Sequence, residues 1–186
     1  AAAVPAVLPP APAWFPYLEM LVSLAASPCR RVRARALAAL QAACLSPALR
    51  RPDFDWPHML RGTCFGLADA LLRPETYAAD PAGMPLSRVQ CAALLSKVFL
   101  QYVSAPSAAV AEYWPALLDR VARLLAGRRA VEDAALAEAD EELAESVKNL
   151  LLVIKAGEPQ APPFWEEAWE KLGGVVDGIS KEMVMS

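Results

Sequence analysis

Four cysteines and a single histidine are the residues of this chain best suited to metal binding or nucleophilic attack. Cys29, Cys44, Cys64 and Cys91 are separated by 15, 20 and 27 residues, whereas zinc knuckles use gaps of about two to four residues. His58 has no second histidine with which to share a metal ion. The spacing therefore predicts four buried, free thiols of a reducing compartment, with no metal site and no cofactor.

The acidic residues do not supply an active site either. The acidic cluster Glu141, Glu142 and Glu145 has no cysteine or histidine near it in the sequence, so no pair of nucleophile and base can be assigned. Negative charge is favourable near the N-terminus of a helix, and we interpret this cluster as a solvated helix start. We expect no catalytic residues and no enzyme activity from this chain.

Four arginines gather at the start of a predicted helix, the end at which the helix dipole disfavours cations. On a helical wheel Arg33 falls inside the apolar arc, and the other three fall outside it. One interpretation is pairing with carboxylates of the same chain. The other is contact with an anionic lipid head group or an acidic partner, strengthened by two further arginines. This second interpretation defines a candidate electrostatic contact formed by Arg30, Arg31, Arg35, Arg50 and Arg51.

The charge of the chain is divided unevenly along its length. Residues 1–129 carry 14 basic and 8 acidic side chains, and residues 130–186 carry 4 basic and 13 acidic side chains. A general nucleic-acid binder should instead be dominated by a basic surface. The densest apolar run, from Leu150 to Ile154, has five residues, far short of the roughly 20 that span a bilayer. We expect neither nucleic-acid binding nor a transmembrane segment.

The composition predicts helices. Apolar residues make up 56 % of the chain, and alanine and leucine, which favour helices, supply much of that fraction. Caps, prolines and apolar periodicity predict seven helices, the second with Ser27 as its N-cap and Pro28 at its first position. In the third helix, Gly62 and Gly66 would permit close approach of a neighbouring backbone. The approximate ranges are 14–26, 28–45, 55–73, 86–103, 107–126, 140–154 and 164–181.

The predicted helices form one domain. Residues 1–13 are a proline-rich lead-in, and residues 14–186 are a single helical-repeat domain. The segment 74–85 contains many residues that break helices and is expected to be a flexible loop. The acidic stretch 130–142 is either a mobile linker or the exposed first turns of the sixth helix, and we favour a linker that becomes helical near Asp140.

Two tryptophans four residues apart are the predicted anchors of the C-terminal end. Trp165 and Trp169 share one face of the last helix. We expect this face to pack on the sixth helix through Val147, Leu150 and Ile154. Amphipathic helices joined by short loops favour a HEAT- or armadillo-like fold, a right-handed stack of antiparallel helix pairs. A closed helix bundle is the alternative.

Three segments carry a resemblance to a known family: ALLSKVFLQ at 93–101, ESVKNLLLVI at 145–154 and FWEEAWEKL at 164–172. Their order and separation are similar to the C-terminal "homology downstream" helical region of the large Golgi-type guanine-nucleotide exchange factors for Arf GTPases, the GBF/Gea family. The resemblance covers about residues 86–184. No segment resembles the loop that carries the catalytic glutamate of that family, so no catalytic residue is transferred.

The resemblance implies a non-catalytic scaffold or regulatory segment that acts in membrane targeting, autoregulation or partner docking. Its implied partners are other helical segments of the same exchange factor and anionic Golgi lipids or a trafficking protein. The implied location is the cytoplasm, at the periphery of Golgi membranes. The alternative is a helical-repeat adaptor unrelated to Arf exchange factors.

Overall fold

The structure is a computed structural model that describes residues 14–49, 54–103, 109–126, 133–157 and 170–172. Every regular element in these ranges is helical. The α-helices are α1 (Trp14–Ala25), α2 (Arg30–Cys44), α3 (Trp56–His58), α4 (Gly66–Leu72), α5 (Pro74–Ala79), α6 (Met84–Val103), α7 (Ala109–Leu125) and α8 (Ala134–Gly157). A 3-10 helix covers Pro47–Leu49, and a π-helical segment, η3 (Met59–Phe65), joins α3 to α4.

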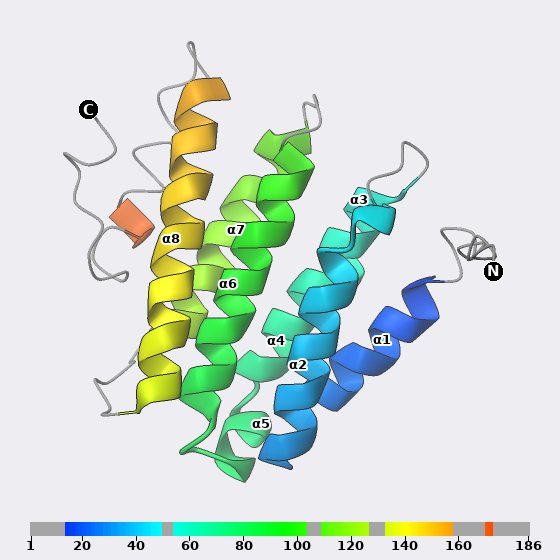
Figure 1. The fold of residues 1–186 in the computed structure, drawn as a ribbon, viewed down its shortest axis with the longest axis vertical. Coiled ribbons are helices and arrows are strands. Elements are labelled where there is room, and N and C mark those ends of the chain that lie inside the picture. The colour runs from blue at the N-terminus through cyan, green and yellow to red at the C-terminus, as the bar shows by residue number, and fades with distance from the viewer. Residues whose placement is uncertain (1–13, 50–53, 104–108, 127–132, 158–169, 173–186) are drawn as a thin grey trace, which may run out of the picture.

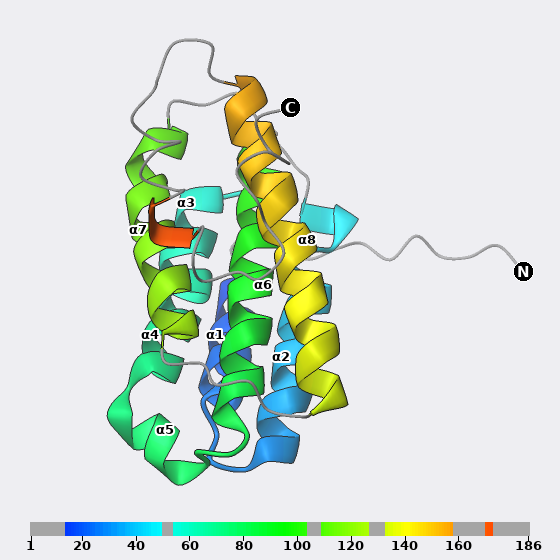
Figure 2. The ribbon, with the colours of Figure 1, turned by 90° about the vertical axis from the view of Figure 1, so that its left-hand side faces the viewer.

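The helices stack side by side from α1 at one end to α8 at the other (Figure 1). Helices α2, α6 and α8 run in the same direction, while α4 and α7 run in the opposite direction and form a second layer (Figure 2). Helix α6 is the central element, since it packs against α2, α4, α7 and α8. This arrangement confirms the predicted all-α fold built from packed helix pairs.

The position of α6 in the core explains why its sequence is apolar on nearly every side. Its side chains are buried on nearly every side, as expected for a helix with neighbours in both layers. Trp114 of α7, which is only 1 % exposed, packs on Phe99 of α6 with ring centroids 5.8 Å apart. Leu150 of α8 is buried in the same hydrophobic cluster. Trp165, Trp169 and the side chain of Ile154 lie outside the described residues, so their predicted packing stays a prediction.

The main differences from the sequence-based assignment are two helix starts and one additional helix. Helix α2 begins at Arg30 and not at Pro28, because Ser27 accepts a hydrogen bond from the Cys29 N–H (3.2 Å) in a turn that precedes the helix. Helix α8 begins at Ala134 and not near Asp140, since Asp133 accepts hydrogen bonds from the first backbone N–H groups. The predicted loop 74–85 contains α5, which Pro74 starts in its first turn.

The long helical stretch from α3 to α4 begins as expected and then differs in its middle. Asp55 caps it by accepting a hydrogen bond from the His58 N–H at 2.8 Å. The π-helical segment η3 was not predicted; it buries five side chains, and the segment packs against α1, α4 and α6. The predicted close backbone approach at Gly62 and Gly66 is wrong. A methyl group at Gly62 would only touch the His58 ring, and one at Gly66 would meet nothing within 4 Å.

Gly66→Ala should therefore stabilise the protein. Gly66 has right-handed helical dihedral angles (φ −58°, ψ −41°), so alanine fits without strain and restricts the unfolded chain. We expect the free energy of unfolding, measured by urea denaturation, to rise by about 0.5–1 kcal/mol. At Gly83 the same change should destabilise, because a methyl group there would collide with Arg30 and Asp80. A loss of stability in Gly66→Ala would contradict the open space at this position.

Candidate electrostatic contact surface on helix α2

Asp80, which follows α5, binds two of the four clustered arginines. Its carboxylate accepts two hydrogen bonds from Arg30, from Nε to Oδ2 at 3.0 Å and from Nη2 to Oδ1 at 2.6 Å. Arg33 Nη2 donates to Oδ2 at 2.5 Å. Ser87, at the start of α6, accepts a hydrogen bond from Arg33 Nε at 2.7 Å. We call Arg30, Arg33, Asp80 and Ser87 the Asp80 cluster.

Arg33 is the member of this cluster that most needs its partners. Its side chain is 0 % exposed, and a buried guanidinium is tolerated only when its charge and its N–H groups are satisfied. Besides Asp80 and Ser87, the backbone carbonyl of Ser27 accepts a hydrogen bond from Nη1 at 2.9 Å. All three guanidinium nitrogens therefore have partners. The position of Arg33 inside the apolar arc is confirmed.

The same contacts determine the charge state of Asp80. Hydrogen bonds from Arg30, then from Arg33, and one from the Gly83 backbone N–H hold the pKa of the Asp80 carboxyl well below its usual range. Gly83 is required at this distance, because a methyl group there would also lie 2.8 Å from Arg33 Nη2. The carboxylate thus stays ionised between two cations throughout the neutral pH range.

The structure does not gather all five predicted contact residues on one free surface. Arg30 is half exposed (56 %) but is paired with Asp80, so intramolecular pairing accounts for Arg30 as well as Arg33. Arg31 and Arg35 are exposed on one face of α2, four residues apart, with no hydrogen bond or ion pair among the described residues. Arg50 and Arg51 lie outside the described residues. The contact itself stays a prediction, for which Arg31 and Arg35 offer the free charges.

Two acidic residues were assigned less specific roles than they have. Asp80 was placed in a flexible loop, although an arginine inside an apolar arc already signals that a carboxylate must face it. Glu142 was assigned to a solvated helix start, but it pairs with Lys97 of α6 and accepts a hydrogen bond from Gln41 of α2 at 3.2 Å. The spacing of Glu142 along α8 carries no sign of these partners, since both come from other helices.

Three of the four cysteines are buried and one is exposed. Cys44, Cys64 and Cys91 are buried, as predicted, but Cys29 is exposed beside the first turn of α2, contrary to the prediction. A hydrogen bond with Cys44 and burial raise the pKa of the Cys64 thiol, and burial raises that of Cys91. Thiols held in the protonated form are poor nucleophiles and poor metal ligands.

The part of the chain that the structure describes contains neither a metal-binding cluster nor a membrane-spanning helix. No group of three histidine, cysteine, aspartate or glutamate side chains there could hold a metal ion. None of the helices in the same ranges combines the length and the apolar character needed to cross a bilayer. The ionic groups found between helices instead connect one helix to the next.

The fold and these inter-helix contacts define a helical-repeat segment. The chain belongs to the family described as GBF1-like, tetratrico peptide repeat region, whose model matches residues 14–179. This membership confirms the resemblance to the Golgi-type exchange factors and excludes an unrelated adaptor. The description names tetratricopeptide repeats, whereas HEAT- or armadillo-like repeats were expected; all three types stack antiparallel helix pairs.

One curated relative extends this finding. The chain is 31 % identical over 176 residues to the Golgi-specific brefeldin A-resistance guanine nucleotide exchange factor 1 homolog of Caenorhabditis elegans. The match covers 92 % of this chain but only 9 % of that relative, so the chain spans a small part of its length. No solved structure matches the chain.

Replacing Asp80 with asparagine should destabilise the protein in a pH-dependent manner. The buried Arg33 would lose its counter-charge, which costs about 3 kcal/mol of unfolding free energy near neutral pH. Because folding lowers the pKa of Asp80, its contribution is complete above the unfolded pKa of about 4 and is lost as the pH falls below that value. The difference between wild type and Asp80→Asn should therefore shrink in urea titrations below about pH 4.

Asp119→Asn is the matched control for this prediction. Asp119 forms an exposed ion pair with Arg123, one turn away on α7, at 3.4 Å, and such pairs contribute less than about 0.5 kcal/mol. An Asp80→Asn variant no less stable than Asp119→Asn would show that the Asp80 cluster does not support the fold.

Proposed function

We propose that this chain is a non-catalytic helical-repeat segment of an Arf guanine-nucleotide exchange factor that acts in Golgi vesicle traffic. The match of residues 14–179 to the GBF1-like repeat region supports the family, and the name of the relative supports nucleotide exchange as the activity of the whole protein. We place that protein in the cytoplasm, at the periphery of Golgi membranes. Other helical segments of the same exchange factor are its expected neighbours.

The observation that carries the scaffold role is that three carboxylates pair with cations on other helices. Asp80 joins α5 to α2, and Glu142 joins α8 to α6 and α2. Asp69 of α4 accepts two hydrogen bonds from Arg120 of α7, at 3.1 and 2.9 Å. These carboxylates are committed to holding helices in register, which suits a rigid support better than it suits proton or charge transfer.

Arg31 and Arg35 are the residues through which we propose that the segment contacts an anionic Golgi membrane. They lie one turn apart on the exposed face of α2, whereas Arg30, Arg33 and Arg120 are paired with carboxylates. A basic residue close to an anionic bilayer contributes about 1 kcal/mol, screened over about 8 Å at physiological salt. Two such residues would act as an auxiliary contact within a larger membrane-associated protein.

The membrane contact can be tested by vesicle flotation. The double variant Arg31→Glu with Arg35→Glu should lower the partition coefficient on phosphatidylcholine vesicles containing phosphatidylserine by about thirtyfold, because about 2 kcal/mol of attraction is lost. The effect should be largest at low salt and absent on pure phosphatidylcholine vesicles. The melting temperature of the double variant should stay near that of the wild type, since neither arginine side chain is buried.

Arg61→Glu with Arg123→Glu is the control, because it makes the same charge change at exposed positions on other helices. It should bind these vesicles better than the α2 variant does. Equal losses in the two variants would mean that only net charge matters, and the proposed contact through Arg31 and Arg35 would be wrong.

The proposed non-catalytic role predicts the result of an exchange assay. Added to an Arf GTPase loaded with a fluorescent GDP analogue, the chain should leave the rate of nucleotide release at its uncatalysed value. The reason is that no segment of this sequence resembles the loop that carries the catalytic glutamate of the family. A release rate that rises in proportion to the concentration of the chain would overturn the non-catalytic assignment.

A further inference from the structure

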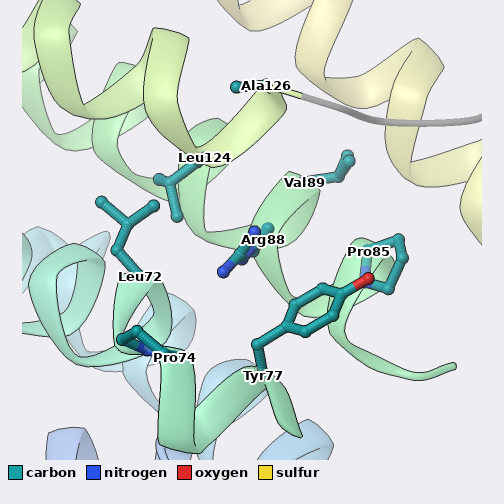
Figure 3. Close-up of a pocket in the computed structure, with 8 residues that line it drawn as sticks. All are labelled: Leu72, Pro74, Tyr77, Pro85, Arg88, Val89, Leu124 and Ala126. Carbon is teal, nitrogen blue, oxygen red and sulfur yellow. The ribbon is translucent and has the colours of Figure 1, made fainter. Parts of the chain in front are cut away.

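A cavity lies where α4, α5, α6 and α7 meet (Figure 3). It has a volume of about 460 Å³, within the range of about 300–1,000 Å³ typical of ligand pockets. Its walls are mainly apolar and come from the end of α4, from α5, from the start of α6 and from the end of α7. The wall residues that matter here are Leu72, Pro74, Pro85, Val89 and Leu124.

Arg88 is the only charged residue among the described residues that line this cavity. Its Nε and Nη2 donate to the backbone carbonyl of Leu71 at 3.2 and 3.1 Å, and its guanidinium carbon lies 4.9 Å from the centre of the Tyr77 ring. The Leu71 carbonyl and the Tyr77 ring therefore hold the guanidinium in place at the cavity. Figure 3 shows Arg88 and Tyr77 among the lining residues. Arginine has five N–H donors, and these contacts engage two of them.

The partners of Arg88 distinguish it from the other fixed cations. Arg30, Arg33, Lys97 and Arg120 each pair with a carboxylate. Among the described residues no carboxylate pairs with Arg88, although burial lowers the pKa of its guanidinium. A positive charge that is partly removed from water and positioned by neutral groups favours a carboxylate, which can accept two parallel N–H bonds from the planar guanidinium.

We propose that this cavity binds a peptide segment of a partner protein in which a carboxylate side chain stands next to an apolar side chain. The carboxylate pairs with Arg88, and the apolar side chain packs between Val89 and Leu124. The lining supports a peptide, because Tyr77 is 41 % exposed at the cavity and tyrosine, apolar with one polar end, is enriched at protein interfaces. The proposal is independent of the membrane contact, since Arg31 and Arg35 do not line the cavity.

The test uses the whole chain and an array of fluorescein-labelled hexapeptides with a central glutamate flanked by leucine or phenylalanine. Members of the array should bind in fluorescence anisotropy, and a central glutamine should weaken them by at least about tenfold. Arg88→Gln should weaken the glutamate peptides equally and leave the glutamine peptides unchanged. When a glutamate peptide binds to the wild-type protein, the methyl NMR signals of Leu72, Val89 and Leu124 should shift. This measurement does not depend on whether the Arg88→Gln variant folds.

The double variant Arg31→Glu with Arg35→Glu is the control and should keep full peptide affinity, which separates this site from the membrane contact. Three results would overturn the proposal. One is equal affinity for the glutamate and glutamine peptides, and another is that no peptide of the array binds. The third is that Arg88→Gln lowers binding to anionic vesicles while peptide binding is unaffected, which would make the cavity a lipid site.

Discussion

The buried guanidinium of Arg33 constrains how this chain can fold. A cation with no exposed surface requires a counter-charge and a hydrogen-bond acceptor for each side of its fork. The chain meets this requirement with Asp80 after α5, Ser87 at the start of α6 and the carbonyl of Ser27 before α2. The α1–α2 connection and the α5–α6 connection with the start of α6, which are distant in the sequence, are thereby brought to one point at the same end of the helix stack.

Two other ion pairs also join separate helices, farther along the stack. Glu142 contacts Lys97 and Gln41 and so links the three helices α2, α6 and α8 that run in the same direction. Asp69 and Arg120 link α4 to α7 in the second layer, and the Arg120 guanidinium lies 4.5 Å from the centre of the Phe65 ring. Exposed pairs contribute little to stability, which comes mainly from the hydrophobic core. We interpret these pairs as determinants of helix register.

Three arginines, in contrast, pair with no carboxylate among the described residues. Arg31 and Arg35 are exposed on α2 without a partner among the described residues, and Arg88 is held by neutral groups at the edge of a cavity. The short helix α5 contributes to both the Asp80 cluster and the cavity at Arg88. Its Tyr77 forms one wall of the cavity, and Asp80 follows directly after its last residue. In a family whose named relative is about ten times longer than this chain, such surfaces suit a segment that supports and positions other parts of a protein.

The sequence by itself determined the class of fold, most helix positions and the family, because apolar periodicity and segments such as ALLSKVFLQ are local properties of the chain. It also placed Arg33 on the core side of its helix. Only the tertiary structure decided that Asp80 and Glu142 are partners of arginine and lysine, that Arg30 is paired and that Arg88 lines a cavity. Each of these depends on contacts between residues 45 or more positions apart, or on several helices meeting. The pattern within one helix cannot encode such contacts, since it records which face is buried and not what lies opposite.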